Sequence, residues 1–534
     1  MSFTSFSGRA GRHAAAFWLG AAAVTLGVGL HLPSYFLSAS GDFRLCGTAI
    51  DPLMIVGMVA ILGGTLAAAY GLLPNDAQPC RAEADAAGPA GEADNPAAAD
   101  RLTGAHWALV ATMSFALVID VMKPATLGFV APGMVIEYGL SRAVIAFLPL
   151  VALLGTSLGS FLWGSIADRL GRRASILLAA IMFIGTSTCG AMPSFAGNVF
   201  MCFVMGLAAG GMLPITFTLM AEMVPARHRG WLLVLLGGLG TAGGYLAASG
   251  LASLLEPHFG WRIMWFLGLP TGLLLILLNQ SIPESPRFLL LHGREAEARR
   301  ILQRFGALAL LREWSADRTT GLSEETAGIG LFRQPYASTT MALNAAAIAW
   351  GLINFGLLLW LPADLRNAGF TVAGSDVLLA QSSLLALPTA AVIAAVYARC
   401  STKWTLVAML ALCAMGLAGL CLMQAGSAAL GDKLLLFVAL LMIGSNGIIA
   451  VLLPYAAENY PLPLRGRGTG WVAGCSKVGG VAAQLASMCA MVPALGAAAL
   501  VLAVPILAAG TMVGRFGPET RGRILDRADR SFAH

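Results

Sequence analysis

The chain has 534 residues, of which 57% are hydrophobic and 11% are charged, and its formal net charge is +6. Soluble domains carry about 25% charged residues, so this composition excludes an ordinary soluble protein and indicates an integral membrane protein. The nine cysteines are scattered without metal-like spacing, so neither a disulfide framework nor a metal site is expected. The basic residues lie in loops between apolar runs, so no nucleic-acid partner is expected.

Apolar runs of about 20 residues recur along the chain, and an α-helix needs this length to cross a hydrocarbon layer of about 30 Å. Each run is predicted to be one membrane-spanning helix, which makes the fold class all-α. The fourteen predicted helices occupy residues 14–36, 50–73, 106–134, 145–166, 174–193, 198–221, 231–254, 261–280, 338–361, 374–397, 404–424, 430–456, 467–488 and 491–514.

The distribution of lysine and arginine orients these helices, because cytoplasmic loops of membrane proteins are enriched in basic residues. If the N-terminus is cytoplasmic, most of the 33 lysines and arginines fall in cytoplasmic segments. Two of them, Lys123 and Lys477, lie within predicted helices, and five lie in outer loops: Arg44, Arg142, Arg262, Arg366 and Lys433. We therefore expect a multi-pass protein of the cytoplasmic (inner) membrane, with both termini in the cytoplasm.

The first two predicted helices stand apart from the others. Residues 1–73 are interpreted as a two-helix membrane appendage. Residues 74–104 are rich in Ala, Asp, Glu, Pro and Gly without periodicity, which predicts a disordered cytoplasmic linker. An alternative is that residues 1–40 are a cleaved signal peptide, with two arginines ahead of the apolar run. The apolar run is long for a signal peptide, which favours the appendage.

The remaining twelve helices form two groups of six. The predicted N-terminal half covers residues 105–282 and the C-terminal half covers residues 338–516. A basic cytoplasmic segment, 283–337, separates them, and residues 517–534 form a cytoplasmic tail. This division predicts two bundles with a site between them, which is a known plan for transporters.

Matching motifs in the two halves indicate an internal duplication. The pattern A-E-x-x-P-x-x-x-R-G occurs at 221–230 and again at 457–466. The pairs Gly243-Gly244 and Gly479-Gly480 keep the same offset, and Pro283-Glu284 and Pro518-Glu519 nearly keep it. Several matched features at one spacing are the signature of a repeated unit.

Asp120 and Lys123 place two charges inside the predicted helix 106–134. Each charge costs about 2.5–3.5 kcal/mol at mid-membrane on insertion scales, so such residues mark functional sites. Residues three apart share a helix face, and Pro124 leaves the carbonyl of Asp120 without its helical partner. Asp120 is the candidate proton-coupling residue and Lys123 a candidate substrate ligand. The alternative is a structural ion pair that neutralises itself.

Lys477 is the other charge expected at mid-membrane, because it follows the start of its predicted helix by about ten residues, or roughly 15 Å. With Asp120 and Lys123 it leaves one positive charge unpaired, and buried charges are normally paired. A bound monoanion would pair it, so the count favours an organic anion such as a carboxylate. Asn354 and Asn446 are further candidate substrate ligands, and Lys477 could instead be a packing residue.

A charged motif between two helices of the N-terminal half predicts a cytoplasmic gate. Its pattern is G-x-x-x-D-R-x-G-R-R, and its charges can form ion pairs that break when the gate opens. The acidic and basic residues of the repeated motif lie at the same membrane surface. The candidate gate residues are Gly164, Asp168, Arg169, Gly171, Arg172, Arg173, Glu222, Arg229, Glu458 and Arg465.

These motifs resemble the major facilitator superfamily over about residues 104 to 523. The segments P-E-S-P-R at 283–287 and P-E-T-R-G at 518–522 are similar to the branch that holds sugar porters, aromatic-acid:proton symporters and synaptic-vesicle-protein relatives. The resemblance implies a twelve-helix fold of two six-helix halves, here with two extra N-terminal transmembrane helices, and alternating access. Asp120 matches the first aspartate of the symporters' D-G-x-D motif, whereas Lys123 replaces the second.

The resulting prediction is a secondary-active transporter of a small organic anion, coupled to protons. Its expected partners are the substrate, protons and the lipid bilayer. Nucleotide-binding loops, nucleophile triads and metal clusters are absent from the sequence, so no cofactor and no enzyme activity is expected. A sugar or polyol porter, an efflux transporter, and a transporter-like sensor that binds without moving its ligand remain alternatives.

Overall fold

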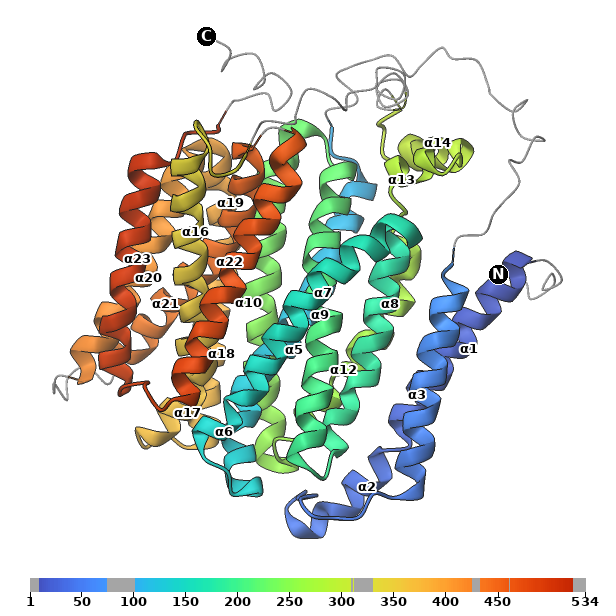
Figure 1. The fold of residues 1–534 in the computed structure, drawn as a ribbon, viewed down its shortest axis with the longest axis vertical. Coiled ribbons are helices and arrows are strands. Elements are labelled where there is room, and N and C mark those ends of the chain that lie inside the picture. The colour runs from blue at the N-terminus through green and yellow to red at the C-terminus, as the bar shows by residue number, and fades with distance from the viewer. Residues whose placement is uncertain are drawn as a thin grey trace.

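The computed structural model describes residues 9–73, 101–308, 311, 330–424, 433–460 and 462–521. All secondary-structure elements in these ranges are helical (Figure 1). Most of the predicted linker (74–100), part of the inter-half segment (312–329) and most of the tail (522–534) lie outside the described residues.

The N-terminal region and the first six-helix group account for the helices up to Ser281. The N-terminal region contains α1 (Arg9–Gly29), α2 (Leu32–Leu37), η1 (Ser38–Gly41) and α3 (Pro52–Gly71). The first group contains α5 (Gly104–Tyr138), α6 (Arg142–Ile145), α7 (Phe147–Leu170), α8 (Arg172–Gly185), η3 (Thr186–Ala191), α9 (Phe195–Met223), α10 (Ala226–Phe259), α11 (Ile263–Phe266), α12 (Gly268–Leu277) and η4 (Leu278–Ser281).

The second group follows two short helices. These are α13 (Pro286–Leu291) and α14 (Glu295–Arg304). The second group contains α16 (Ala337–Leu352), the π-helical turn η5 (Ile353–Leu357), α17 (Leu358–Asn367), α18 (Val372–Ala386), α19 (Thr389–Arg399), α20 (Thr402–Gln424), α21 (Leu434–Asn459), α22 (Leu462–Met488) and α23 (Leu495–Phe516).

Each of the fourteen predicted apolar runs coincides with helical structure. Within the described part of the chain, twelve helices are long and apolar enough to cross a membrane. Two helices of the predicted set do not meet this criterion. One is α12, which is short, and the other is α22, which carries the charged side chain of Lys477.

Local signals in the sequence explain where several helices begin and end. The Ser194 hydroxyl accepts a hydrogen bond from the Gly197 N–H at the start of α9. Pro52 occupies the first turn of α3, where its missing N–H costs nothing. At the end of α5, Gly139 adopts φ = +63°, a left-handed conformation that glycine tolerates best.

The two halves stand side by side, and their helices run roughly along the long axis of the molecule (Figure 1). Helices α13 and α14 lie at one end, which we call the linker end. Helices α6 and α17 lie at the opposite end, which we call the far end. In Figure 1 the linker end is at the top and the far end at the bottom.

Helices α1 and α3 pack on the N-terminal half beside α8 (Figure 1). Phe17, Val24 and Val28 belong to the same buried apolar cluster as Leu177 and Ile181 of α8. The Tyr35 hydroxyl donates a hydrogen bond to the carbonyl oxygen of Phe259 at the end of α10. These contacts attach the N-terminal region to one half only.

Glycines allow close helix contacts within each of the two halves. A Cβ on Gly206 of α9 would lie 2.1 Å from the carbonyl oxygen of Ala152 in α7. A Cβ on Gly351 of α16 would lie 2.0 Å from the carbonyl oxygen of Ser476 in α22. Small residues commonly let membrane helices approach in this way. The contact at Gly351 holds α22, which carries Lys477, closely against α16.

We expect Gly351→Ala to destabilise the protein, because the added methyl group has no space against α22. Overpacking of this kind costs about 1–3 kcal/mol. Thermal unfolding of the purified protein should show a lower Tm. Gly474→Ala on α22 is the matched control, since nothing lies within 4 Å of a Cβ there. Equal melting temperatures for the two variants would contradict the packing argument.

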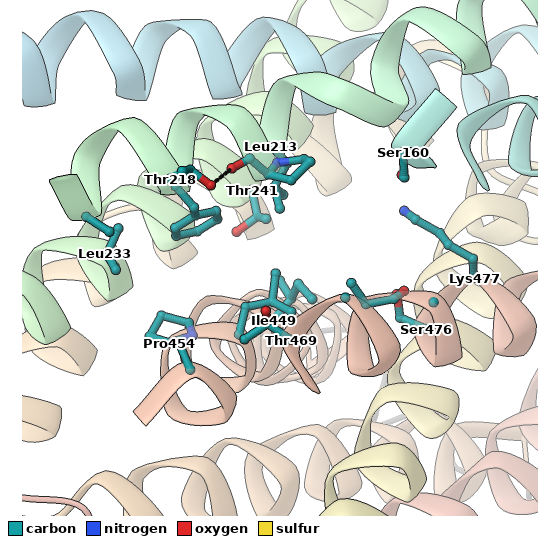
Figure 2. A pocket seen from close by; sticks show the side chains of 18 of the residues that line it. Ser160, Leu213, Thr218, Leu233, Thr241, Ile449, Pro454, Thr469, Ser476 and Lys477 are labelled. Atoms are coloured by element: carbon teal, nitrogen blue, oxygen red, sulfur yellow. Dashed lines mark hydrogen bonds between the residues drawn. The ribbon is translucent and has the colours of Figure 1, made fainter. Parts of the chain in front are cut away.

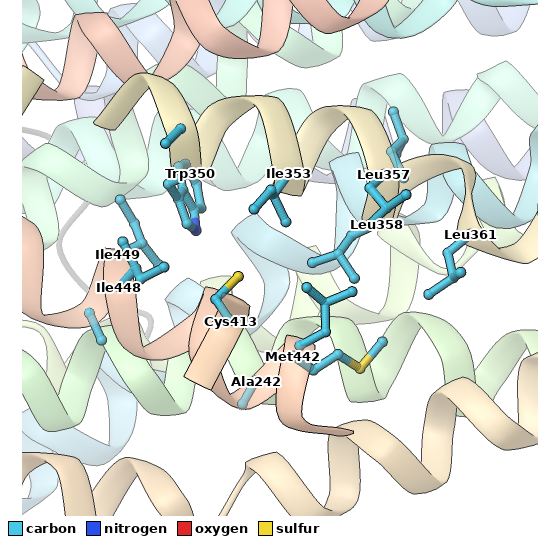
Figure 3. Close-up of a cluster of buried hydrophobic side chains, with 14 of the residues drawn as sticks. Ala242, Trp350, Ile353, Leu357, Leu358, Leu361, Cys413, Met442, Ile448 and Ile449 are labelled. Carbon is cyan, nitrogen blue, oxygen red and sulfur yellow. The ribbon is translucent and has the colours of Figure 1, made fainter. Parts of the chain in front are cut away.

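A cluster of buried apolar side chains holds the π-helical turn η5 in place (Figure 3). Ile353 and Leu357 of this turn belong to the same buried cluster as Met442 of α21. Trp350 packs in the same cluster and donates a hydrogen bond of 2.9 Å from Nε1 to the carbonyl oxygen of Ser445. Because π-helical turns often occur at functional sites, the side chains that η5 leaves outside this cluster are of interest.

Candidate functional site

A cavity of about 2360 Å³ lies between the two halves. Helices α5, α7, α9 and α10 line it from one half, and η5, α21 and α22 line it from the other. Its lining includes the exposed residues Arg227, Trp471 and Arg521, so it reaches the surface at the linker end. Arg142 and Arg366 at the far end are not among its lining residues.

Lys477 projects into this cavity from α22, toward Ser160 of α7 (Figure 2). Its ammonium lies 4.8 Å from the centre of the Phe355 ring, which is a favourable cation–π distance. Among the described residues, Lys477 Nζ forms no hydrogen bond and no ion pair within 4.0 Å. The ammonium is therefore positioned to bind an anionic group.

Asp120 lines the same cavity from α5. Its Oδ1 atom is buried and has no hydrogen-bond partner. The charges of Asp120 and Lys477 act on each other across the space between the halves. Asn354 of η5 and Asn446 of α21 also line the cavity. The structure thus brings together four of the five residues predicted to bind substrate or protons.

Lys123 is the exception, because it points away from the cavity. Its side chain is 1% exposed, and Nζ donates hydrogen bonds to the Phe183 carbonyl oxygen at 3.1 Å and to Ser187 Oγ at 3.5 Å. A Cβ on Gly268 would lie 2.0 Å from Nζ, so α12 closes this pocket. From Asp120 to Lys123 the helix turns by about 300°, which is about 60° short of a full turn. The Lys123 side chain therefore points in a different direction from Asp120, into the space between α8 and α12. The predicted shared face with Asp120 is therefore wrong.

The far end is held closed by ion pairs that join the two halves. Arg142 Nη1 of α6 lies 2.5 Å from Asp364 Oδ1 of α17. The Arg142 guanidinium also lies 4.5 Å from the centre of the Trp360 ring. Beside this pair, Arg366 of α17 lies 3.3 Å from Glu256 of α10. These contacts separate the cavity from the far-end surface.

A cavity between two bundles, closed at one end and open at the other, is the geometry of an alternating-access transporter. A comparison with protein families agrees with this geometry. The family model described as "Sugar (and other) transporter" matches residues 131–532. The chain belongs to this family. It is a transporter of the major facilitator type and not an enzyme.

Several curated relatives of this transporter are similar over most of their length. The niacin transporter NiaP of Acinetobacter baylyi is 25% identical over 427 residues, which cover 79% of this chain and 96% of NiaP. The gallate transporter of Pseudomonas putida is 29% identical over 404 residues, covering 72% and 86%. The 4-hydroxybenzoate transporter PcaK of Pseudomonas aeruginosa is 27% identical over 398 residues, covering 72% and 86%.

Solved structures of the proton:xylose symporter XylE share the fold of this transporter. The structure of XylE bound to 6-bromo-6-deoxy-D-glucose matches with a TM-score of 0.64 at 18% sequence identity. The match covers 79% of this chain and 98% of XylE. An inward-open structure of XylE from E. coli matches with a TM-score of 0.63 at 17% identity.

The predicted gate residues of the transporter gather at the linker end. Arg172 Nη2 lies 3.4 Å from Asp168 Oδ1 and 3.5 Å from Glu222 Oε1. Glu222, Arg229, Glu458 and Arg465 line the mouth of the cavity. Gly164, Asp168 and Arg169 are exposed at this surface.

Glu458 of α21 is held by two hydroxyl groups. Its Oε2 atom accepts hydrogen bonds from the Tyr397 hydroxyl at 2.7 Å and from the Thr520 hydroxyl at 2.6 Å. A Cβ on Gly230 of α10 would lie 2.6 Å from Glu458 Oε1, so this carboxylate contacts the other half. Glu458 is thus placed where the halves meet at the linker end.

The repeated Pro-Glu pairs place one carboxylate at the start of a helix in each half. Glu284 accepts the backbone N–H groups of Arg172 and Arg173 where α8 begins, and Gly171 adopts φ = +98° beside it. Burial raises the pKa of Glu284, although its hydrogen bonds from backbone N–H groups oppose this. The repeated Pro-Glu sequence therefore has the same structural role in both halves, which is to cap the start of a helix with a carboxylate.

Glu519 is the counterpart of Glu284 in the C-terminal half. It accepts the Thr402 N–H at 3.0 Å where α20 begins, and it also accepts the Ser401 and Thr402 hydroxyls. Burial acts to raise the pKa of Glu519, but these hydrogen bonds outweigh it and lower the pKa to about 2. Glu519 is therefore ionised at neutral pH and stabilises the positive end of the helix dipole.

Sequence reasoning missed several cavity residues. Thr156, Ser157 and Ser160 of α7 and Thr241 of α10 add hydroxyl groups to the wall opposite Lys477. The segment T-S-x-x-S inside an otherwise apolar run was the signal that could have identified the α7 residues. Each hydroxyl also donates a hydrogen bond to a helix carbonyl oxygen, as Ser160 does to Gly210 at 2.9 Å. The T-S-x-x-S pattern alone is therefore as compatible with a helix-packing role as with substrate binding.

We expect Asp364→Asn to shift the transporter toward opening at the far end. The substitution removes the charge that pairs with Arg142 across the two halves. A loss of about 1 kcal/mol for this partly exposed pair changes the closed-to-open ratio about fivefold. Distances between spin labels on opposite sides of the far end would report the shift. Glu297→Gln is the matched control, since its exposed ion pair with Arg294 lies at the start of α14, outside both gates. An equal response of both variants would contradict the assignment of the Arg142–Asp364 pair to the far-end gate.

Proposed function

We propose that this transporter carries a small organic anion, an aromatic monocarboxylate, together with a proton. The observation that carries the proposal is the Lys477 ammonium, which projects into the cavity between the halves without a hydrogen-bonding partner among the described residues. A carboxylate is a natural partner for it, because charge-assisted hydrogen bonds are about twice as strong as neutral ones.

Charge balance in the cavity supports coupling to a proton. Because Lys123 lies outside the cavity, the mid-cavity charges are one negative, Asp120, and one positive, Lys477. An anion that pairs with Lys477 leaves Asp120 as an unpaired buried charge, which is costly. Protonation of Asp120 removes that cost. The anion and one proton are therefore expected to bind together and to leave together.

Two features favour an aromatic over an aliphatic carboxylate. The Phe355 ring lies next to Lys477, where it can stack on an aromatic substrate. The cavity wall also contains apolar side chains such as Phe217 and Leu359. In addition, the named substrates of the relatives niacin, gallate and 4-hydroxybenzoate transporters are aromatic acids. Asn354 and Asn446 are proposed to hydrogen-bond the ring substituents.

We further propose the placement of the protein in its membrane. The linker end, with its basic residues, would face the cytoplasm, and the state described by the structure would then be open to the cytoplasm. Residues 105–282 and 338–516 would rock against each other around the site, with 283–337 connecting them. The N-terminal helices α1 and α3 would be an addition to the twelve-helix core that moves with the N-terminal half.

Counterflow in liposomes tests the proposed function directly. Vesicles loaded with unlabelled benzoate, nicotinate or 4-hydroxybenzoate should accumulate the labelled compound from outside. Vesicles loaded with xylose or with an organic cation should not. Exchange of xylose but not of carboxylates would establish the sugar-porter alternative, which the family description also allows. Binding without any exchange would identify a sensor.

A further inference from the structure

A second group of buried charges lies at the far end, outside the cavity. Arg366 of α17 stands between two carboxylates, Glu256 of α10 and Asp376 of α18. Its Nη1 lies 3.3 Å from Glu256 Oε1, and its Nη2 lies 3.3 Å from Asp376 Oδ1. Glu256 is 8% exposed and Asp376 is fully buried.

The charges of this group do not balance if all three side chains are ionised. Two carboxylates face one guanidinium, so one negative charge is left in a buried place. Oxygens of both the Glu256 and the Asp376 carboxyl groups lie 3.3 Å from the same atom, Arg366 Nη2, so the two carboxyl groups are close neighbours. Two carboxylates at this separation repel, and one shared proton converts the repulsion into a hydrogen bond.

The neighbouring polar groups do not supply the missing positive charge. Ser375 donates its hydroxyl proton to Asp376 at 3.2 Å, and Arg366 Nε donates to Ser375 at 3.4 Å. Tyr245 of α10 donates its hydroxyl proton to the Leu358 carbonyl oxygen. These groups leave the excess negative charge in place.

Two basic groups on the adjacent described elements are already paired. Arg142 of α6 pairs with Asp364 of α17, and Arg262, which precedes α11, pairs with Glu137 of α5 at 2.7 Å. A proton is therefore the cation that fits between Glu256 and Asp376.

The group is divided between the two moving parts of the transporter. Glu256 belongs to the N-terminal half, whereas Arg366 and Asp376 belong to the C-terminal half. Opening the far end separates Glu256 from the other two and exposes it to water. A solvated glutamate titrates near 4.3, so Glu256 is ionised at neutral pH when the far end is open.

We propose that Glu256 and Asp376 bind one proton between them when the far end closes. Closing then takes up a proton and opening releases it, so acid pH favours the closed far end. The proton enters and leaves on the far side, and it is not carried across the membrane. The inference rests on the alternating access of the proposed function, but it requires neither Asp120 nor an anionic substrate.

Spin labels across the far end provide the test on the full-length protein in liposomes. Cysteines introduced for Val144 of α6 and Ala368 after α17 are exposed positions on opposite halves. Reactive native cysteines are replaced by serine in this background. Pulsed electron–electron double resonance then measures the distances between the two labels, and these give the closed and open populations as a function of pH.

For one coupled proton, the closed-to-open ratio should rise by up to about tenfold for each unit that pH falls, above about pH 4.3. Glu256→Gln should stay closed with no pH dependence, because its amide replaces the proton permanently. Asp376→Asn is a second such variant. The matched control is Glu297→Gln, which alters an exposed pair with Arg294 and should respond like the wild type.

Two results would overturn the inference. One is a wild-type closed population that does not change with pH or that falls at acid pH. The other is a wild-type response in both Glu256→Gln and Asp376→Asn. Failure of the proposed function gives a different pattern: the pH response of the gate would persist while no carboxylate exchanges in counterflow. Asp120→Asn should leave the gate response unchanged, which separates the two protons.

Discussion

Lys477→Ala is expected to lower the affinity for a carboxylate substrate by about 30-fold or more. Removing one member of a buried charge pair at a binding interface costs 2–5 kcal/mol, and every 1.4 kcal/mol is a tenfold change in affinity. The loss is large because, among the described lining residues, Lys477 is the basic side chain at this depth, whereas Arg227 and Arg521 line the mouth. Lys477→Arg keeps the charge and should retain part of the affinity.

Thermal shifts of the purified protein measure this effect without a transport assay. A ligand at about 100 times its Kd stabilises the folded state by about 2.7 kcal/mol. Benzoate or nicotinate at that excess should raise the Tm of the wild type and of Lys433→Ala, whose lysine is exposed at the start of α21. The same concentration should raise the Tm of Lys477→Ala much less, because the stabilisation falls with the ratio of ligand concentration to Kd. An equal shift in all three proteins would show that Lys477 is structural.

The architecture followed from the sequence because each signal was local or repeated. Apolar runs of membrane length located the helices, and the paired motifs at 221–230 and 457–466 divided them into two halves. The depth of Asp120 and Lys477 within their runs was enough to place both side chains in the cavity, since a helix converts residue number into distance. The Pro-Glu pairs likewise took the equivalent positions that the repeat implied.

The far-end gate could not be predicted in this way. Arg142, Glu256 and Arg366 lie in separate predicted loops or helix ends, and nothing in the local sequence identifies their partners. Their pairing depends on how the two halves meet, which is a property of the tertiary arrangement. The same holds for the π-helical turn at 353–357, because one extra residue in a helical turn leaves no compositional signal.

The direction of Lys123 was predicted incorrectly for a related reason. A spacing of three residues fixes an angle of about 60° between side chains, which is compatible with one face or with two neighbouring interfaces. Packing against Phe183 and Gly268 selects the second possibility. The excess positive charge that first suggested an anion is therefore absent from the middle of the cavity, where the charges of Asp120 and Lys477 balance. The carboxylate proposal rests instead on Lys477, with Asp120 as its counter-charge.

Asp120→Asn is expected to abolish accumulation driven by a pH gradient while leaving exchange intact. Asparagine is neutral at every pH, so it imitates the protonated aspartate and lets an anion pair with Lys477 without a proton. Counterflow of the carboxylate should continue at a rate close to that of the wild type. A pH gradient, which can support up to tenfold accumulation per unit for one coupled proton, should produce none in the variant.

Uptake into proteoliposomes with an imposed pH gradient, measured beside counterflow in the same preparation, distinguishes this outcome from a loss of folded protein. Glu297→Gln at the linker end is the matched control, because its carboxylate is exposed, pairs with Arg294 outside the cavity and should not carry the coupled proton. Two results would remove Asp120 from the coupling role: gradient-driven accumulation that persists in Asp120→Asn, or a loss of counterflow together with accumulation. The second result would mean that the carboxylate contacts the substrate or supports the site, because a neutral side chain at that position could not satisfy it.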